Sequence, residues 1–187
     1  MYTIQKEFSA DLAHRVHTQK LDCKFTENNS KRLKCRGLHG HTVSMLIKLQ
    51  ADELVNEMVL DYNEIGWFKK LIDDILDHKT LLCSDDPIFK KVFAPLAKET
   101  YVLPEYSTEK FLVKKFKLDD VEDPDILELV NSITILNFPS TSENLAHWLH
   151  DVVQKNIDDF NIRNNTNVKC CEVAYMETPK SKAVFLG

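Results

Sequence analysis

The sequence lacks features that would place it in several large protein classes. No run of apolar residues approaches the roughly 18 that a membrane-spanning helix needs, and the first residues alternate in polarity instead of forming a signal-type apolar stretch. The formal net charge is -5, whereas sequence-independent nucleic-acid binding needs a basic surface. We therefore expect neither a membrane protein nor a nucleic-acid-binding protein.

Cysteines are few, and their spacing is not that of a structural framework. Their number is odd, and none of them forms a CxxC pair, so neither a disulfide scaffold nor a cysteine zinc knuckle is indicated. Because no secretion signal is recognisable, we expect reduced thiols in a cytoplasmic protein. The cysteines are Cys23, Cys35, Cys83, Cys170 and Cys171.

Length and composition predict one globular domain that spans residues 1–187. Hydrophobic residues make up 43% of the chain and charged residues 28%, which suffices for a real core. No repeat, low-complexity tract or linker-like gap divides the sequence. The middle, at about residues 85–138, has less clear periodicity than the rest of the chain.

Two long segments alternate strictly between apolar and polar residues, the pattern of half-buried strands. The first covers about residues 3–16 and the second about residues 39–50. Two shorter strands are predicted near the C-terminus, at residues 168–177 and 183–186. A further short strand is predicted at residues 133–136.

Two segments carry apolar residues at helical spacing behind a capping-box pattern. The first follows Asp61 and Glu64 and is expected to reach about Asp77. The second follows Ser140 and Glu143 and carries the longest apolar stripe in the chain, from Leu145 onward. In the less regular middle, short helices are predicted at residues 86–94, 107–116 and 124–130. These elements indicate an α+β fold.

Three histidines fall on the apolar faces of the two long strands. His39 and His41 are two residues apart and so point to the same side, with Gly40 between them allowing a close approach. His14 is in phase with the apolar residues of the first strand. Taken singly, His14 is better explained as a core histidine, and a chance loop tripeptide explains His39 and His41 as well as a metal site does. Taken together, they match the three-imidazole ligand set of a catalytic zinc with an open fourth position.

Four other residues are candidates for chemistry. Cys35 lies four residues before His39, where a nearby cation would favour its thiolate. Asp77 and His78 form an adjacent carboxylate–imidazole pair, which suits acid–base work but equally suits a helix C-terminus. Glu177 ends a predicted strand, and it is either an exposed strand-end residue or an acceptor for a planar amidine-like edge.

These segments together resemble the 6-pyruvoyl-/6-carboxytetrahydropterin synthase family, which has the tunnelling fold (T-fold). They follow the family order and span nearly the whole chain, with the likeness fading in the middle. The histidine of the first strand lies six residues after Phe8 rather than the usual four, and Leu82 stands where asparagine is frequent. The matching segments are Phe8–Arg15, Cys35–His41, Met58–Tyr62, Leu76–His78, Ser140–Asn144 and Glu177–Thr178.

The resemblance implies a role for each candidate residue. His14, His39 and His41 would hold Zn²⁺. Cys35 would be a proton-transferring thiolate, and Asp77 with His78 a second acid–base unit contributed by a neighbouring subunit. Glu177, Thr141 and Glu143 would bind the pterin substrate.

The implied fold is a four-stranded antiparallel sheet with two long helices on one face, here with an inserted helical excursion at about residues 95–131. The implied assembly is a homo-oligomer, commonly a hexamer, with active sites at subunit interfaces.

The implied reaction starts from 7,8-dihydroneopterin triphosphate. The three residues between Cys35 and His39 resemble the 6-carboxytetrahydropterin synthases of the deazapurine (queuosine) pathway, lyases that release acetaldehyde and triphosphate. The helix start at residues 140–144 looks more like the pyruvoyl-forming branch. The expected activity is therefore 6-carboxytetrahydropterin synthase. The alternatives are 6-pyruvoyltetrahydropterin synthase and a catalytically silent zinc- or pterin-binding T-fold protein.

Overall fold

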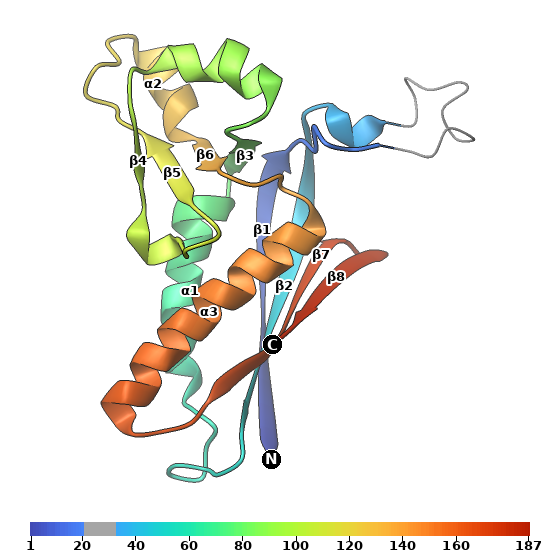
Figure 1. Ribbon diagram of the computed structural model, residues 1–187, viewed down its shortest axis with the longest axis vertical. Coiled ribbons are helices and arrows are strands. Elements are labelled where there is room, and N and C mark those ends of the chain that lie inside the picture. The colour runs from blue at the N-terminus through green and yellow to red at the C-terminus, as the bar shows by residue number, and fades with distance from the viewer. Residues whose placement is uncertain (21–32) are drawn as a thin grey trace. The chain divides into compact units, whose positions relative to one another are not determined.

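The computed structural model describes residues 1–20 and 33–187, so Cys23 lies outside the described residues. The chain divides into two compact units. The first unit consists of Met1–Asp11, Thr42–Asp77 and Ser142–Gly187, and the second of Leu12–His41 and His78–Thr141. Strands β1 (Tyr2–His14) and β2 (His39–Ala51) contribute residues to both units (Figure 1).

The alternation predicted for the two long strands is confirmed. In β1 the even-numbered residues Ala10, Leu12 and His14 are buried, while the odd-numbered neighbours are mostly exposed. In β2 the odd-numbered residues from Val43 to Ala51 are buried. Each strand therefore has one core-facing side, and the residues on that side are those that the sequence pattern assigns to it.

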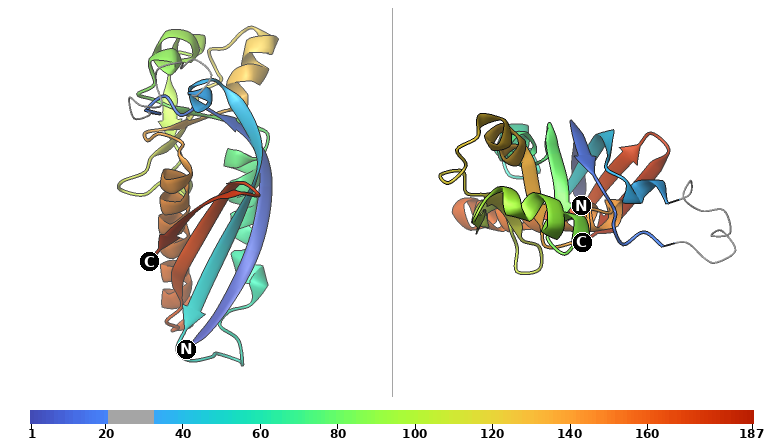
Figure 2. Two further views of the ribbon diagram at one scale, coloured as in Figure 1. Left: turned by 90° about the vertical axis from the view of Figure 1, so that its right-hand side faces the viewer. Right: turned by 90° about the horizontal axis from the view of Figure 1, so that it is seen from above.

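The first unit contains the antiparallel part of the sheet and the long helix α3 (Ser142–Asn164). Strand β2 pairs antiparallel with β7 (Lys169–Thr178), and β7 pairs antiparallel with β8 (Ser181–Leu186). Helix α3 packs on β7 and β8, as Figures 1 and 2 show. The apolar stripe predicted for it is buried and includes Leu145, Trp148, Leu149, Val152 and Val153.

The helical segment before Asp77 is less regular than its sequence suggests. It consists of a 3₁₀ helix (Tyr62–Ile65), helix α1 (Gly66–Leu71) and a π-helical turn (Ile72–Leu76). The Asp61 carboxylate caps its start by accepting the backbone N–H of Asn63 at 2.8 Å. The segment ends because Asp77 is extended and His78 has a φ of 54°, and neither conformation continues a helix.

The second unit contains the strand predicted at residues 133–136 and further strands that sequence periodicity did not reveal. Strand β3 (Lys79–Cys83) runs parallel to residues 12–14 of β1 and to β6 (Ile133–Leu136). Beyond β6, strands β5 (Val113–Phe116) and β4 (Thr100–Val102) are added antiparallel. The rest comprises helix α2 (Pro124–Asn131), a π-helical turn (Phe89–Phe93) and 3₁₀ helices at Lys34–Arg36, Ala94–Leu96 and Pro104–Tyr106.

The prediction of a four-stranded antiparallel sheet is therefore wrong. Within residues 1–20 and 33–187, eight strands form the sheet, in the order β4-β5-β6-β3-β1-β2-β7-β8, and the β1–β3 and β3–β6 pairs are parallel. The sheet is larger than predicted because β3 pairs with the end of β1. Strand β6 pairs with β3, β5 with β6, and β4 with β5. The helix predicted at residues 107–116 is also wrong, because that segment contains β5. The segment at 95–131 is thus a mixture of strands and helix rather than a helical excursion.

The second unit has its own hydrophobic core, built on strands β3, β5 and β6. Leu82 of β3 is fully buried at its centre. A large apolar side chain at this position accordingly serves packing within the sheet. The core residues are Leu82, Phe89, Phe116, Val130, Ile133 and Ile135.

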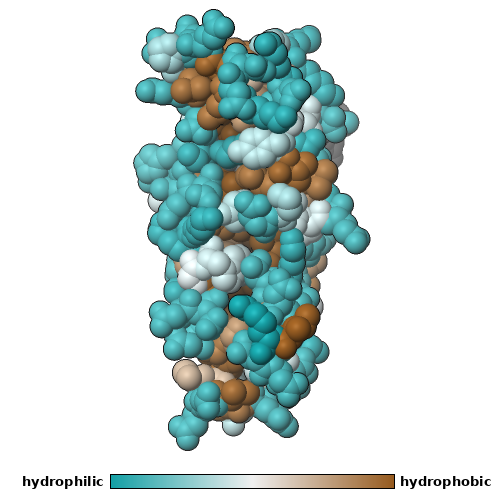
Figure 3. All heavy atoms as spheres, turned by 90° about the vertical axis from the view of Figure 1, so that its left-hand side faces the viewer, coloured by the Kyte–Doolittle hydropathy of each residue, from teal (hydrophilic) through white to brown (hydrophobic). Residues whose placement is uncertain are grey.

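Among the described residues, no helix combines the length and hydrophobicity needed to cross a bilayer. On the face shown in Figure 3, hydrophilic side chains predominate and hydrophobic ones lie between them in smaller groups. Scattered exposed apolar side chains of this kind are ordinary for a folded domain.

Candidate metal centre

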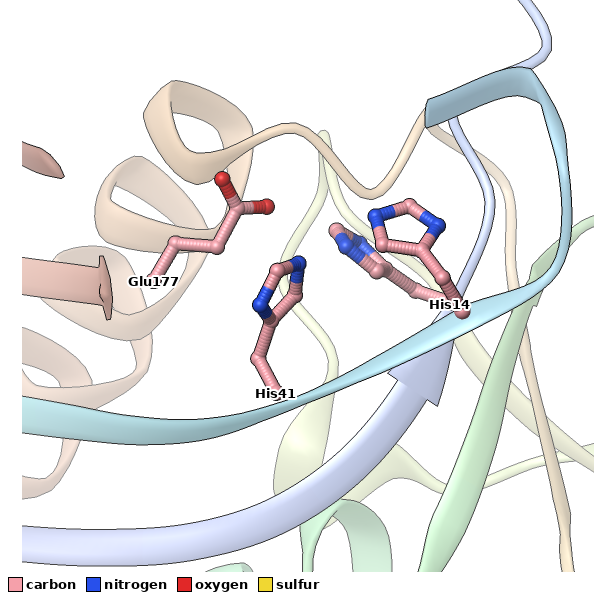
Figure 4. A group of neighbouring side chains, drawn as sticks. His14, His41 and Glu177 are labelled. Carbon is pink, nitrogen blue, oxygen red and sulfur yellow. The ribbon is translucent and has the colours of Figure 1, made fainter. Parts of the chain in front are cut away.

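Three histidines of the second unit meet where β1 ends and β2 begins. His14 is the last residue of β1, and His39 and His41 are the first and third residues of β2. Strand periodicity places His39 and His41 on one side of β2, and the side chains of His14 and His41 approach each other in Figure 4. The structure thus brings together three side chains that the sequence separates by up to 27 positions.

The imidazoles lie at distances suited to a shared ion. Ring centroids are 4.7 Å apart for His14 and His39, 5.4 Å for His14 and His41, and 4.9 Å for His39 and His41. One ring nitrogen of each lies within 4.8 Å of the corresponding atoms of the others. His14 has no solvent-exposed area, and the Nε2 atoms of all three rings are buried.

Backbone carbonyls determine the orientation of two of these rings. The Nδ1 atom of His14 lies 2.9 Å from the carbonyl oxygen of Ser140, and Nδ1 of His39 lies 2.9 Å from that of Gly37. Because a carbonyl oxygen only accepts, Nδ1 must carry the proton in both rings. In the neutral imidazole Nε2 then holds a lone pair. This is the arrangement found in metal-ligating histidines, whose second nitrogen donates to a carbonyl or carboxylate.

The donor set fits a zinc ion. Nε2 of His39 is buried and has no hydrogen-bond partner among the described residues, which is costly for a polar atom unless an ion binds it. Three neutral imidazole nitrogens are the protein ligands of a common class of catalytic zinc site, in which water or substrate takes the fourth position. His14, His39 and His41 therefore have the chemistry and spacing with which they could hold a metal ion.

Gly40, between the two histidines of β2, leaves room for the close approach of β1. A Cβ atom built on Gly40 would lie 3.2 Å from the carbonyl oxygen of Leu12, a backbone atom that cannot swing aside. The absence of a side chain therefore allows the start of β2 to lie against the end of β1. This contact helps to hold His39 and His41 near His14.

The comparison with known protein families identifies the family of the chain. A family model described as 6-pyruvoyl tetrahydropterin synthase matches residues 3–187. The chain belongs to this family. Members of the 6-pyruvoyl tetrahydropterin synthase family are lyases, and the resemblance stated from six separate sequence segments is thereby confirmed.

Two relatives carry names from the carboxy-forming branch. A Pyrococcus abyssi protein, provisionally named a 6-carboxy-5,6,7,8-tetrahydropterin synthase, is 23% identical over 150 residues, covering 80% of this chain and 74% of the relative. A 6-carboxy-5,6,7,8-tetrahydropterin synthase of Haemophilus influenzae is 31% identical over 83 residues, which is 42% of this chain and half of the relative.

Solved structures share the fold. A Wolinella succinogenes protein, described only as uncharacterised, superposes with a TM-score of 0.85 at 32% identity, covering 100% of this chain and 98% of its own. The Caenorhabditis elegans 6-pyruvoyl tetrahydropterin synthase superposes with a TM-score of 0.51 at 20% identity, covering 100% of this chain and 95% of its own. At that identity the second likeness concerns the fold alone.

Cys35 lies in the same unit as the histidines. It is the central residue of the 3₁₀ helix Lys34–Arg36 and is a partly exposed free thiol. Its carbonyl oxygen accepts the backbone N–H of Val16 at 2.7 Å. That hydrogen bond ties the segment entering β2 to the segment leaving β1, two residues beyond His14.

Asp77 and His78 follow the π-helical turn at the boundary of the two units. Within the first unit, the Asp77 carboxylate accepts the backbone N–H of Asp11 at 3.0 Å, and the carboxylate of Asp11 accepts the hydroxyl of Thr42 at 2.5 Å. His78 is exposed and has a left-handed backbone, which is uncommon for any residue other than glycine. Such strain often accompanies a functional position.

The three residues predicted to bind substrate lie at the ends of other elements. Thr141, partly buried in the second unit, immediately precedes α3, and its N–H donates to the carbonyl of Pro139 at 2.9 Å. Glu143 is exposed in the first turn of α3, and Glu177 is partly buried near the end of β7, both in the first unit. Their predicted roles in pterin binding stay predictions.

The groups that orient the histidines are not apparent from the sequence. The capping-box pattern assigns Ser140 to a helix cap, but α3 begins at Ser142, and the Ser140 hydroxyl donates to the carbonyl of Arg15 at 3.3 Å. A backbone carbonyl that accepts from His14 has no sequence signature, because every residue has one.

Proposed function

We propose that this protein is a zinc-dependent 6-carboxytetrahydropterin synthase that acts on 7,8-dihydroneopterin triphosphate. The observation that carries the proposal is the cluster of His14, His39 and His41, with Nδ1 of two rings engaged by carbonyls. Membership of the family and the names of two relatives support the choice of substrate and product. The three-residue spacing between Cys35 and His39 supports the carboxy-forming branch.

The proposed reaction needs no external oxidant. One molecule each of 7,8-dihydroneopterin triphosphate and water gives 6-carboxy-5,6,7,8-tetrahydropterin, acetaldehyde and triphosphate. Two carbons of the side chain leave as acetaldehyde, the carbon attached to the ring becomes the carboxylate, and the dihydropterin ring is reduced. A zinc ion bound by the three histidines would act as a Lewis acid on oxygen atoms of the substrate side chain.

The chain's own residues supply the remaining chemistry. Cys35, as a thiolate, is proposed to move a proton between the side chain and the ring of the substrate, and Asp77 with His78 to form the second acid–base unit. Glu177 is proposed to accept two parallel N–H bonds from the 2-amino and N3 edge of the pterin, which fixes the ring. Thr141 and Glu143 are proposed to contact the same substrate.

The family also supports proposals about assembly and location. We propose a cytoplasmic homo-oligomer, a hexamer by resemblance, in which active sites lie at subunit interfaces and residues 1–187 act as one domain. An assembly of this kind would cover the open edges of the sheet, which otherwise invite unwanted pairing. The protein is proposed to act in the pathway that supplies deazapurine precursors such as that of queuosine.

The decisive experiment identifies the product. Zinc-loaded protein is incubated with 7,8-dihydroneopterin triphosphate, and the products are analysed by mass spectrometry with a separate assay for acetaldehyde. A 6-carboxytetrahydropterin together with stoichiometric acetaldehyde is expected. Recovery of unchanged substrate by protein that has bound zinc would overturn the enzyme assignment and favour a binding role.

The second candidate is 6-pyruvoyltetrahydropterin synthase. It is favoured by residues 140–144, which look more like that branch, and by the description of the family model. The same experiment distinguishes the two, because a 6-pyruvoyl product retains all side-chain carbons and no acetaldehyde appears. That result would keep the site and change the product.

A further inference from the structure

A chain of contacts in the second unit leads from His14 to a buried carboxylate. The His14 ring donates to the carbonyl oxygen of Ser140, and the Ser140 hydroxyl donates to the carbonyl oxygen of Arg15. The guanidinium Nε of Arg15 then lies 2.6 Å from Oδ2 of Asp86. His14, Ser140 and Asp86 have no solvent-exposed area, and 16% of the Arg15 side chain is exposed.

Hydrogen bonds within its own turn fix the position of Asp86. Its backbone N–H donates to the carbonyl of Cys83 at 3.0 Å, and its Oδ1 accepts the backbone N–H of Ile88 at 2.8 Å. Its carbonyl accepts the backbone N–H of Lys90 at 3.1 Å. The turn directly follows β3, which pairs with the end of β1 so that His14 lies opposite Leu81. The carboxylate is therefore anchored to the strand beside His14.

Arg15 and Asp86 form an ion pair that is largely shielded from solvent. A carboxylate with no exposed area needs a counter-ion or several hydrogen bonds, because removing its charge from water is costly. Oδ2 has no hydrogen bond to a described residue, so the Arg15 charge is the group that balances it. Removing either partner leaves a buried charge, and the backbone around Arg15 would have to move to rehydrate it.

We propose that Asp86 is a positioning residue for the metal centre. It holds Arg15, which continues directly from His14, and so it keeps the end of β1 against the Ser140 loop. This keeps the Ser140 carbonyl on Nδ1 of His14 and directs Nε2 toward the other two imidazoles. The inference rests on the proposed zinc site, and it concerns Asp86 and Arg15, neither of which belongs to the three-histidine ligand set or to the predicted catalytic residues.

The test measures zinc affinity rather than turnover. Apo protein is titrated with Zn²⁺ against a chromophoric chelator for the wild type and for D86N, R15Q and D86N/R15Q. The matched control is D85N, which removes an exposed neighbouring carboxylate paired with Lys90 at 3.2 Å. Groups that orient metal ligands typically change affinity about 10- to 100-fold, and we expect at least about 10-fold weaker binding for D86N and little change for D85N.

The double variant shows whether Asp86 acts through Arg15. Because the D86N/R15Q protein contains no unbalanced charge at this position, its loss of affinity should be much smaller than the product of the two single losses. A Co²⁺-substituted D86N protein should also show altered visible absorption, which reports ligand geometry. A protein in which Asp86 only stabilises the fold would lower Tm in D86N without changing either readout.

The outcomes separate this inference from the proposed function. If the wild type binds no zinc, both the metal-dependent function and the positioning role are wrong. If the wild type binds zinc and D86N matches D85N, only the positioning role is overturned. If D86N does not fold, R15Q is used in its place. Zinc binding by R15Q that is as tight as in the wild type would then contradict the proposal.

Discussion

The backbone N–H of Val16 donates to the carbonyl oxygen of Cys35 at 2.7 Å. Val16 lies two residues after His14 and Cys35 four residues before His39, so this hydrogen bond joins the segment leaving β1 to the segment entering β2. Because the contact uses the main chain, it survives replacement of the cysteine side chain. The thiol at position 35 can therefore be removed without removing the link.

Replacement of Cys35 by alanine should abolish turnover and leave zinc binding intact. General acid–base groups typically contribute about 10²- to 10⁴-fold, and we expect a loss of kcat of that size. Turnover is measured with 7,8-dihydroneopterin triphosphate, and zinc content by elemental analysis of the same preparations. Unchanged turnover in C35A would remove Cys35 from the mechanism.

The three histidines should each be needed for zinc. Replacing His39 by alanine removes an imidazole whose Nε2 is buried and has no hydrogen-bond partner among the described residues, so bound zinc should fall from about one ion per chain to a small fraction. His147 is the matched control, because its ring stacks on Phe185 at 3.9 Å within the first unit. H147A should retain zinc. Full occupancy in H39A, measured by elemental analysis after dialysis, would show that His39 is not a ligand.

The longest elements found from sequence are those with one buried face, whereas the short predicted strand β6 is buried at all four residues. Strands β1 and β2 alternate because one side of each meets the core, and α3 shows its stripe for the same reason. Strand β3 escapes prediction because it lies between two parallel neighbours, and its last three residues, Leu81–Cys83, are all buried, so no alternation appears. Strand β4 is not predicted either, because its three residues are exposed at an edge of the sheet and show no alternation.

Thiol reactivity should differ sharply among the cysteines. Burial raises the pKa of Cys170 to about 12, and burial also raises the pKa of Cys83, so both are almost entirely protonated near neutral pH. Cys35 is partly exposed. Since the thiolate is the reactive form, iodoacetamide at about pH 8 should modify Cys35 well before Cys170 and Cys83. Peptide mass mapping checks this, and Cys170 should react only after unfolding in denaturant.

Two glycines provide opposite tests of local geometry. G40A places a methyl group 3.2 Å from the Leu12 carbonyl, which should destabilise the protein by about 1–3 kcal/mol and weaken zinc binding. G66A meets no atom within 4 Å at a position with helical backbone, and it should stabilise by about 0.4–1 kcal/mol. Urea unfolding of both variants measures the two effects. Equal changes of the same sign would contradict the crowding argument at Gly40.

The sequence predicts the side chains of the candidate metal centre but not the backbone groups that orient them. Strand periodicity alone assigns His14, His39 and His41 to the apolar faces of the two long strands, and they can form one cluster if those strands pair. The group that orients His14 has no such signal, because the Ser140 carbonyl is a backbone group 126 residues away. The sequence around Asp86 predicts only the start of a short helix, since nothing in it shows that the carboxylate is buried against Arg15.

Leu82 tests the packing that β3 brings to the second unit. The resemblance to the family makes asparagine a natural replacement at this position, but Leu82 has no exposed area and lies in the hydrophobic core with Phe89 and Ile135. L82N would bury an amide without partners and lose apolar contacts, and we expect a loss of at least about 3 kcal/mol of unfolding free energy. The matched control is L129N, at a residue that is 43% exposed in α2, where the change should stay below about 1 kcal/mol. Urea unfolding compares the two variants, and similar stabilities would show that β3 does not carry the core of this unit.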